Sequence, residues 1–150
     1  MWQPQGVMDI PHNNANNLYS QMNGVYSDIR DIDKVNSTLG GIEGINGGID
    51  YEKLSSARLL SSSEYTLNKE LGFISLKTAL RADEVLAVAY EFTYGGQTYQ
   101  VGEFSSDVKE SRSTLLVKLI KPNACSPNNG CWDLMMKNVY SLGTRSLKSN

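Results

Sequence analysis

The two cysteines are the residues whose types and spacing most directly suggest chemistry in this chain. Cys125 and Cys131 flank the turn-forming residues SPNNG, and a pair at this spacing can close a small disulfide loop, which would indicate an oxidising compartment. Two unrelated thiols are the alternative interpretation. Because the sequence offers no second pair of ligands, a zinc site is not predicted.

The other polar residues do not form a catalytic pattern. His12 is the sole histidine, so neither a histidine-activated nucleophile nor a catalytic metal site can be assembled around it. The acidic trio Asp28, Asp31 and Asp33 lacks the ligand pattern of a calcium loop. The glycine-rich segment 40–50 lacks the Lys-Ser/Thr of a phosphate-binding loop. We therefore expect no catalytic residue, no metal and no cofactor, and hence a protein that is not an enzyme.

Carboxylates and tyrosines leave two weaker interpretations. A pair of glutamates could act in glycoside hydrolysis, but polar positions of strands and turns explain them better: Glu64, Glu70, Glu91 and Glu103. The chain has eight tyrosines, which could form a sugar-binding platform because each has an apolar face and a polar tip.

Charge and hydropathy argue against nucleic-acid binding, membrane binding and a membrane-spanning helix. With 14 basic and 16 acidic residues, and a pI near 5.4, neither a nucleic acid nor an anionic membrane is an expected partner. No run approaches the roughly 18 apolar residues of a spanning helix. The N-terminus lacks the basic and apolar regions of a signal peptide. We expect the chain to be a segment of a longer protein.

The element best suited to position side chains is a hairpin predicted within residues 83–104. Gly95-Gly96 separates two runs of β-branched and aromatic residues, and it suits a two-residue turn because both positions can take a positive φ. This turn predicts three cross-strand pairs: Tyr94 with Gln97, Phe92 with Tyr99, and Tyr90 with Val101. Period-2 alternation then gives one face that should meet a core, formed by Leu86, Val88, Tyr90, Phe92, Tyr99 and Val101.

A second regular pattern predicts an amphipathic helix over 17–39. Its apolar residues recur at spacings of about three and four, and they include Leu18, Met22, Val25, Ile29, Ile32 and Leu39. The stripe either packs on its own domain or forms a coiled-coil seam in which Asn36 sets the register.

The whole sequence predicts an α+β fold, mainly β: an antiparallel, β-sandwich-like sheet of about six strands with one N-terminal and one C-terminal helix. Further strands are expected at Ala57–Leu60, Glu64–Leu67, Gly72–Leu76 and Thr114–Lys121. The predicted organisation is an irregular leader (1–16), a single domain (17–143) and a tail (144–150). The domain comprises a helix (17–39), a Gly-rich loop (40–50), a β region (51–121) and a helix (132–142).

Three segments also resemble a known family. EYTLNKELGFISLKTALRADEVLAVAYEFTYGGQTYQVGEFSSD, TLLVKLIKP and WDLMMKNVYSLG are similar to the SprA family, also called Sov. The leader MDIPHNNANNLYSQM resembles a piece just upstream in that family. The loop from Cys125 to Cys131 departs from the family pattern.

The resemblance implies a function. SprA/Sov proteins are outer-membrane translocons of the type IX secretion system and take part in gliding motility. This chain would then be a soluble, non-catalytic fragment of a very large β-barrel, at the outer membrane or cell surface, with the extracellular side favoured over the lumen or periplasm. Expected partners are other parts of the barrel, secretion-system subunits or secreted client proteins. The alternative is a cell-surface β-sandwich module that binds carbohydrate or acts as an adhesin.

Overall fold

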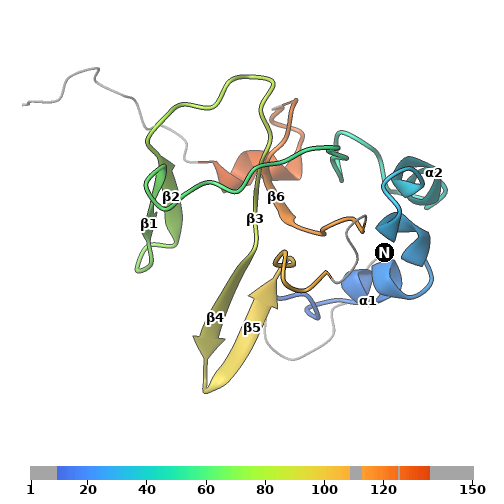
Figure 1. Ribbon diagram of the computed structural model, residues 1–150, viewed down its shortest axis with the longest axis horizontal. Coiled ribbons are helices and arrows are strands. Elements are labelled where there is room, and N and C mark those ends of the chain that lie inside the picture. Colours follow the sequence, from blue (N-terminus) through green and yellow to red (C-terminus); the bar gives the residue numbers. More distant parts are fainter. Residues whose placement is uncertain (1–9, 109–112, 125, 136–150) are drawn as a thin grey trace, which may run out of the picture.

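The chain forms a mixed α+β fold of short antiparallel strands and a few short helices (Figure 1). The computed structural model describes residues 10–108, 113–124 and 126–135. Its strands are β1 (Tyr65–Asn68), β2 (Phe73–Leu76), β3 (Leu86–Val88), β4 (Tyr90–Tyr94), β5 (Gln97–Val101) and β6 (Lys118–Lys121). Its helices are α1 (Leu18–Asn23), α2 (Val35–Gly40) and the 3-10 helices η1 (Ser27–Arg30) and η2 (Gly130–Leu134).

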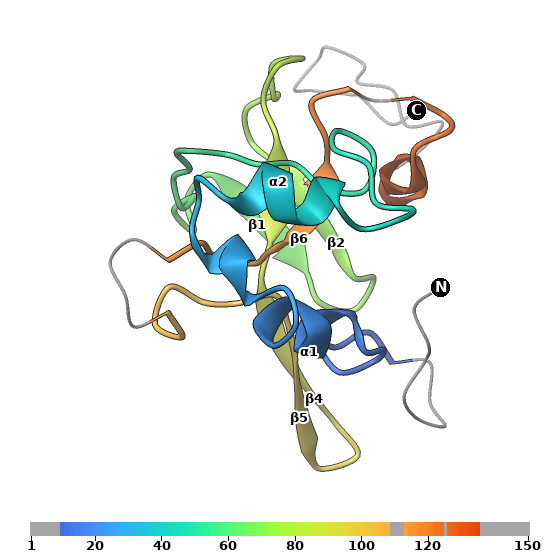
Figure 2. The same ribbon diagram turned by 90° about the vertical axis from the view of Figure 1, so that its right-hand side faces the viewer.

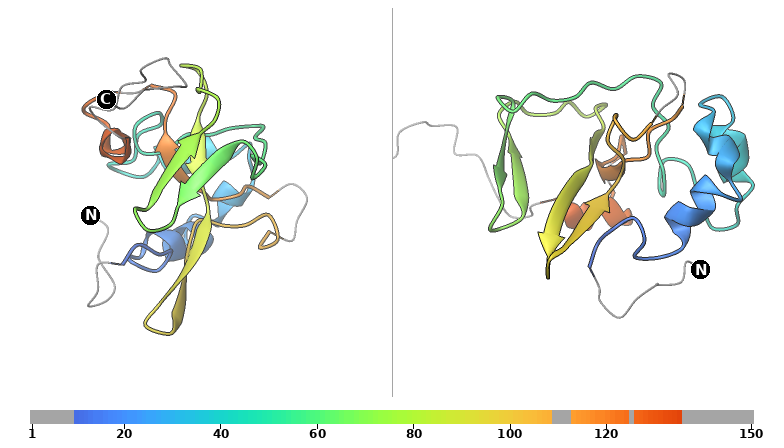
Figure 3. Two further views of the ribbon diagram at one scale, coloured as in Figure 1. Left: turned by 90° about the vertical axis from the view of Figure 1, so that its left-hand side faces the viewer. Right: turned by 60° about the horizontal axis from the view of Figure 1, so that its bottom comes forward.

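The six strands pair as three two-stranded antiparallel sheets, β1–β2, β3–β6 and β4–β5. This arrangement confirms the mainly β, antiparallel character, but the strands do not hydrogen-bond into the one sheet that was expected. Figures 1 and 3 show β1–β2 and the N-terminal helices at opposite ends, with β3–β6 between them. β3 leads into β4 through the single residue Ala89, and the β4–β5 hairpin projects from the rest of the chain (Figure 2).

The register predicted for the β4–β5 hairpin is confirmed. Tyr94 pairs with Gln97, Phe92 with Tyr99, and Tyr90 with Val101. The turn residues Gly95 and Gly96 have φ values of 59° and 80°, the left-handed conformation that glycine adopts without steric cost. The register therefore agrees with the one that the turn residues alone predict.

The hairpin face that was expected to meet a core is only partly covered. Val101 is buried and Phe92 is half-buried, whereas Tyr90 and Tyr94 are 37% and 56% exposed. Phe92 stacks on Tyr99 with ring centroids 5.5 Å apart, so these two rings cover one another. We call Tyr90, Phe92, Tyr94 and Tyr99 the aromatic row.

Because Phe92 is half-buried, its truncation should be milder than that of a core phenylalanine. Phe92→Ala is expected to lower the free energy of unfolding by about 1–2 kcal/mol, against about 3–5 kcal/mol for a fully buried ring. Urea unfolding followed by circular dichroism would measure the change. Tyr94→Ala, at the exposed end of the row, is the control and should be nearly neutral. A loss as large as that of a core ring would contradict the partial burial.

The prediction of one continuous helix over 17–39 is wrong, because the structure has three short helices there, α1, η1 and α2. α1 ends at Asn23, and the N–H of the next residue, Gly24, bonds back to the carbonyls of Ser20 and Gln21. Glycine in a helix interior costs about 1 kcal/mol relative to alanine. η1 ends at Arg30, and the next residue, Asp31, takes extended dihedrals and forms an isolated antiparallel bridge with Ser113. A tertiary contact therefore outweighs helical propensity at the second break.

The breaks fold the apolar stripe onto itself and create the hydrophobic core of the described chain. Ile29, Val35 and Leu39 are 2%, 8% and 6% exposed. Partly buried apolar side chains surround them: Met22, Tyr26, Ile32, Ile42, Ile45, Tyr51 and Leu116. The stripe thus packs on its own domain, as in the first of the two interpretations, whereas Val25 is 77% exposed.

Two expected strands are shorter or absent. Ala57–Leu60 is not a strand, and Leu59 within it is 96% exposed. The strand expected over Thr114–Lys121 is regular only as β6, because its first residues bond instead to Arg30 and Glu103. No helix in the described ranges is long and apolar enough to cross a membrane.

The C-terminal expectations fall mostly beyond the described ranges. η2 covers the start of the helix predicted over 132–142, and the remainder of that helix and the tail lie outside the described residues, as do Cys125 and the first part of the leader.

Candidate functional site

The most strongly organised polar group of the described chain is the carboxylate of Glu103. Gly102, at φ 72°, turns the chain out of β5, and the N–H of Glu103 then donates to the Leu116 carbonyl at 2.8 Å. A Cβ at position 102 would lie 3.2 Å from the Cβ of Ala89, so the close crossing with Ala89 favours glycine. The glutamate that follows is carried inward and is 3% exposed.

Four donors converge on this carboxylate. Arg30 donates from Nη1 to Oε2 at 2.8 Å and from Nη2 to Oε1 at 2.6 Å. The Tyr19 hydroxyl donates to Oε1 at 2.7 Å, and the Leu116 backbone N–H donates to Oε2 at 2.9 Å. We call Tyr19, Arg30 and Glu103 the clamp, because they join α1, η1 and the segment after β5.

Arg30 and its neighbours extend the clamp to a third part of the chain. Arg30 Nη1 also donates to the Thr114 carbonyl at 3.0 Å, and its guanidinium bonds the side-chain oxygen of Asn23. In return, the Thr114 N–H donates to the Arg30 carbonyl at 2.9 Å, and its Oγ1 donates to the Ile29 carbonyl at 2.6 Å. The clamp thus holds the hydrophobic core at Ile29 against the segment that leads into β6.

The electrostatics of the clamp stabilise its charged form. Burial alone raises the pKa of the Glu103 carboxyl, but the hydrogen bonds from Arg30, Leu116 and Tyr19 outweigh burial and hold the pKa below its usual value. The hydrogen bond to Glu103 raises the pKa of Arg30. Burial, and then the contact with Glu103, raises the pKa of Tyr19.

An ionised carboxylate has about four acceptor positions, and in Glu103 four donors fill them. A carboxylate paired with guanidinium and saturated in this way is a poor general base, because taking a proton would break the pairing. The arrangement can therefore support structure rather than proton transfer.

The clamp predicts how stability depends on pH. A folded-state pKa below the unfolded value of 4.5 means that the contribution of Glu103 is fully present above pH 4.5 and is lost as the pH falls below it. The difference in free energy of unfolding between the wild type and Glu103→Gln should therefore shrink between about pH 5 and about pH 3. Urea titrations across this range would measure it. A difference that is constant with pH would contradict the role of the charge.

A cleft of about 350 Å³ lies beside the clamp, between the leader and β5. It is lined by His12, Asn13, Asn14, Tyr19, Thr98, Tyr99, Gln100 and Asp107. The His12 ring meets Tyr99 edge-on at 5.2 Å, and its Nδ1 lies 2.8 Å from the Ile10 carbonyl. The lining thus combines aromatic and polar side chains.

Asn13 ties the leader to the edge of β5. Its N–H donates to the Gln100 carbonyl at 2.8 Å, its side-chain oxygen accepts from the Gly102 N–H at 2.8 Å, and its side-chain nitrogen donates to the Gly102 carbonyl at 2.9 Å. These bonds cover the outer edge of β5 at its C-terminal end.

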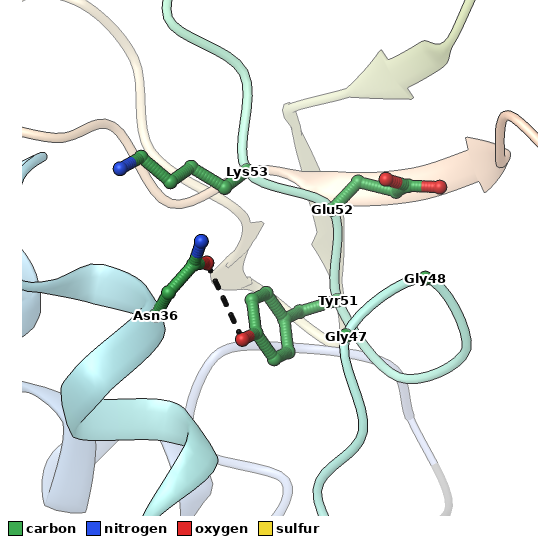
Figure 4. Close-up of a pocket in the computed structure, with 6 residues that line it drawn as sticks. All are labelled: Asn36, Gly47, Gly48, Tyr51, Glu52 and Lys53. Carbon is green, nitrogen blue, oxygen red and sulfur yellow. Dashed lines mark hydrogen bonds between the residues drawn. The ribbon is translucent and has the colours of Figure 1, made fainter.

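A second hollow, of about 280 Å³, lies over the glycine-rich loop (Figure 4). Tyr51 points across it and donates a long hydrogen bond of 3.4 Å to Asn36, while the side chains of Lys53 and Glu52 extend in opposite directions (Figure 4). Because charged groups do not converge in this hollow, it does not have the geometry of an ion or phosphate site.

The structure does not bring the residues considered from sequence into one site. Asp28 pairs with Lys34 at 3.3 Å, and Asp31 accepts from the Asp33 N–H at 3.0 Å. No group of potential metal ligands is found among the described residues. Glu64 bonds Arg58 and the Ser61 N–H, which lowers the pKa of Glu64 to about 2.

The disulfide between Cys125 and Cys131 stays a prediction, because Cys125 lies outside the described residues. Cys131 is in η2, with its Sγ 3.8 Å from the Leu119 carbonyl at the neighbouring β6 strand.

The clamp was missed from sequence. Glu103 was weighed only as one of four strand and turn glutamates, and neither Tyr19 nor Arg30 was considered. Arg30 and Glu103 are 73 residues apart in the chain, so no local spacing connects them. The one available signal was Gly102, directly before the glutamate, which marks a sharp turn at the end of a predicted strand.

Comparison of the chain with protein-family models, with curated proteins and with solved structures found no match.

Proposed function

We propose that this chain is a non-catalytic domain of a large outer-membrane β-barrel translocon for type IX protein secretion and gliding motility, and that its role is structural and protein-binding. The membership in such a translocon rests on the resemblance of its segments to the SprA/Sov family. The observation that carries the binding role is the aromatic row, which stands on the projecting β4–β5 hairpin (Figure 2) with Tyr90 and Tyr94 37% and 56% exposed.

The clamp supports this role because it gives the hairpin a firm base. Glu103 lies two residues after the end of β5 and is held by Arg30 and Tyr19. A rigid support lowers the entropy that an aromatic surface loses when it binds a partner. Aromatic side chains are also enriched in the centres of protein interfaces.

The accessibility of the hairpin in the full-length parent protein tests the location. An epitope inserted between Gly95 and Gly96 would be probed with antibody on intact cells and again after the outer membrane has been opened. Labelling of intact cells would place the domain in an extracellular cap, in reach of secreted clients. Labelling only after opening would place it in the lumen or periplasm, as a plug or a dock for accessory subunits. A parent protein that does not fractionate with the outer membrane would contradict the proposal.

The binding role is tested by removing the three β4 residues of the aromatic row from the parent. Replacing Tyr90, Phe92 and Tyr94 with serine should lower secretion while the amount of parent protein in the membrane stays unchanged. Serine at Thr93 and Thr98, on the opposite face of the same hairpin, is the matched control and should leave secretion intact. Unchanged secretion in the aromatic variant would contradict the binding role, and turnover of a substrate by the chain would contradict a non-catalytic one.

The single six-stranded, sandwich-like sheet remains part of the proposal for the assembled parent. A lone two-stranded hairpin is only marginally stable in water, so three separate pairs gain from further strands. Neighbouring parts of the barrel would supply those strands and join the pairs into one sheet.

A second candidate is a cell-surface module that binds carbohydrate or acts as an adhesin. The cleft beside Tyr99, with its aromatic and polar walls, favours it, since sugars bind against aromatic faces and polar rims. A glycan array separates the two candidates. Specific binding that is lost in Tyr99→Ala, or in Tyr94→Ala, would favour the module over the translocon domain.

A further inference from the structure

The outer edge of β4 carries open backbone groups. In a hairpin with a two-residue turn, the pair that flanks the turn is hydrogen-bonded, and alternate pairs follow. The register therefore directs the N–H and C=O groups of Tyr90, Phe92 and Tyr94 toward β5, and those of Glu91 and Thr93 away from it. Within the described residues, no backbone or side-chain group bonds these outward-facing groups.

The two edges of the hairpin differ in their protection. On β5, the outward carbonyl of Gln100 accepts from Asn13, so the leader covers the C-terminal end of that edge. β4 has the sequence YEFTY, without the lysine, proline or bulge that usually blocks an edge strand. Its aromatic residues alternate along one face. Such an edge is a template for another strand.

We propose that this edge pairs with β4 of a second copy of the chain, antiparallel and centred on Phe92. Glu91 then lies opposite Thr93 of the second copy, and each such pair exchanges two N–H···O hydrogen bonds. The product is a four-stranded sheet in the order β5–β4–β4–β5. Both of its remaining edges are β5 edges, whose C-terminal ends Asn13 covers, so further growth of the sheet is disfavoured.

Self-complementarity is what selects a second copy as the occupant. In this register Phe92 lies beside Phe92 and Tyr90 beside Tyr94, so the aromatic rows of the two copies become continuous, and adjacent aromatic pairs stabilise sheets. A shift of one pairing step in one direction would set Glu91 opposite Glu91, and like charges directly opposite one another are unfavourable. A shift in the other direction would set Glu91 opposite Gly95, which lies in the turn, and would lose that strand pair. The sequence of β4 therefore favours one register of self-pairing.

The short edge predicts a weak dimer, with a Kd on the order of 0.1–1 mM, because small interfaces bind weakly. Sedimentation equilibrium of the whole chain under reducing conditions, from about 10 μM to about 1 mM, should show a mass that rises from 16.6 kDa toward twice that value. Reducing conditions remove any contribution of cysteines to dimer formation.

Two proline variants locate the interface. Thr93→Pro removes an outward N–H from the β4 edge and should abolish the dimer. Thr98→Pro is the matched control, because Thr98 is the cross-strand partner of Thr93 and its N–H faces the other edge. The control should dimerise like the wild type, since proline is tolerated on edge strands.

A charge pair tests the register without relying on proline. Thr93→Glu sets a glutamate opposite Glu91 of the second copy, twice in each dimer, and should raise the Kd about tenfold. Adding Glu91→Lys to that variant sets lysine opposite glutamate and should restore the wild-type Kd. If both proline variants lose the dimer because the hairpin unfolds, the single variant Thr93→Glu and the double variant with Glu91→Lys still test whether the β4 edges pair.

A monomer over the whole concentration range would overturn the proposal. So would a dimer that neither Thr93→Pro nor Thr93→Glu weakens. The same holds if Thr93→Glu weakens the dimer and the added Glu91→Lys does not restore it. A monomer in which the amides of Glu91 and Thr93 are protected from hydrogen exchange would show that a segment of the same chain occupies the edge. None of these results bears on the membrane location, so the translocon proposal can fail or stand independently.

Discussion

Replacing Glu103 with glutamine is expected to lower the free energy of unfolding by about 3 kcal/mol, because removing one partner of a buried ion pair leaves the other charge uncompensated. The side chain of Glu103 is 4% exposed and that of Arg30 is 25% exposed, so water can relieve only part of the cost. A glutamine amide would also turn a donor toward the donors of Arg30. Urea unfolding at neutral pH would measure the loss.

Two further variants show whether the loss arises in the clamp. Glu91→Gln removes the same charge from an exposed position of the hairpin and should be nearly neutral. Tyr19→Phe removes one donor from the Glu103 carboxylate and should cost about 1 kcal/mol. If Glu103→Gln were as mild as Glu91→Gln, Glu103 would not be the ionised centre that the geometry indicates.

Truncation of Ile29 should have an effect of similar size for a different reason. Ile29 is 2% exposed and lies at the centre of the core formed by η1 and α2. Ile29→Ala would leave a cavity there and is expected to cost about 2–5 kcal/mol. The same urea experiment applies, and a loss of native circular dichroism at room temperature would be the extreme form of this result.

Val25 provides the control for Ile29. Both residues belong to the apolar stripe from which the N-terminal helix was predicted, yet Val25 is 77% exposed. Val25→Ala should therefore change the free energy of unfolding by less than about 0.5 kcal/mol. Equal losses at the two positions would mean that the stripe is buried along one side, as in an unbroken helix, which would contradict the division into α1, η1 and α2.

The hairpin could be predicted because it depends on residues that are close together in the sequence. The prediction of one helix over 17–39 failed because a break in it involves a distant residue. Gly95-Gly96 determines the β4–β5 register because the turn needs only the two residues themselves. The break at Asp31 instead depends on Ser113, which no periodicity within 17–39 reveals. Gly24 lies inside the predicted helix, but its cost of about 1 kcal/mol relative to alanine is too small to predict a helix end by itself.

Burial was harder to predict than secondary structure. The apolar face of the hairpin was expected to meet a core. Alternation of apolar and polar residues identifies such a face, but it does not show which residues, if any, cover it. In the structure the core lies instead around Ile29, and much of the aromatic row remains accessible. The clamp was out of reach for a related reason: a tyrosine, an arginine and a glutamate scattered over the chain carry no shared pattern.

The long-range bonds of the clamp also determine the order in which the chain can become structured as it is synthesised. Thr114 binds the Ile29 carbonyl across 85 residues, and Glu103 binds Arg30 across 73. Turns such as Gly95-Gly96 close within microseconds once their residues are available, whereas these bonds must wait for the chain beyond position 114. Within this segment, the N-terminal residues are therefore expected to complete their packing last. Until then the apolar side chains around Ile29 are exposed, and a chaperone that holds extended chains has its natural target there.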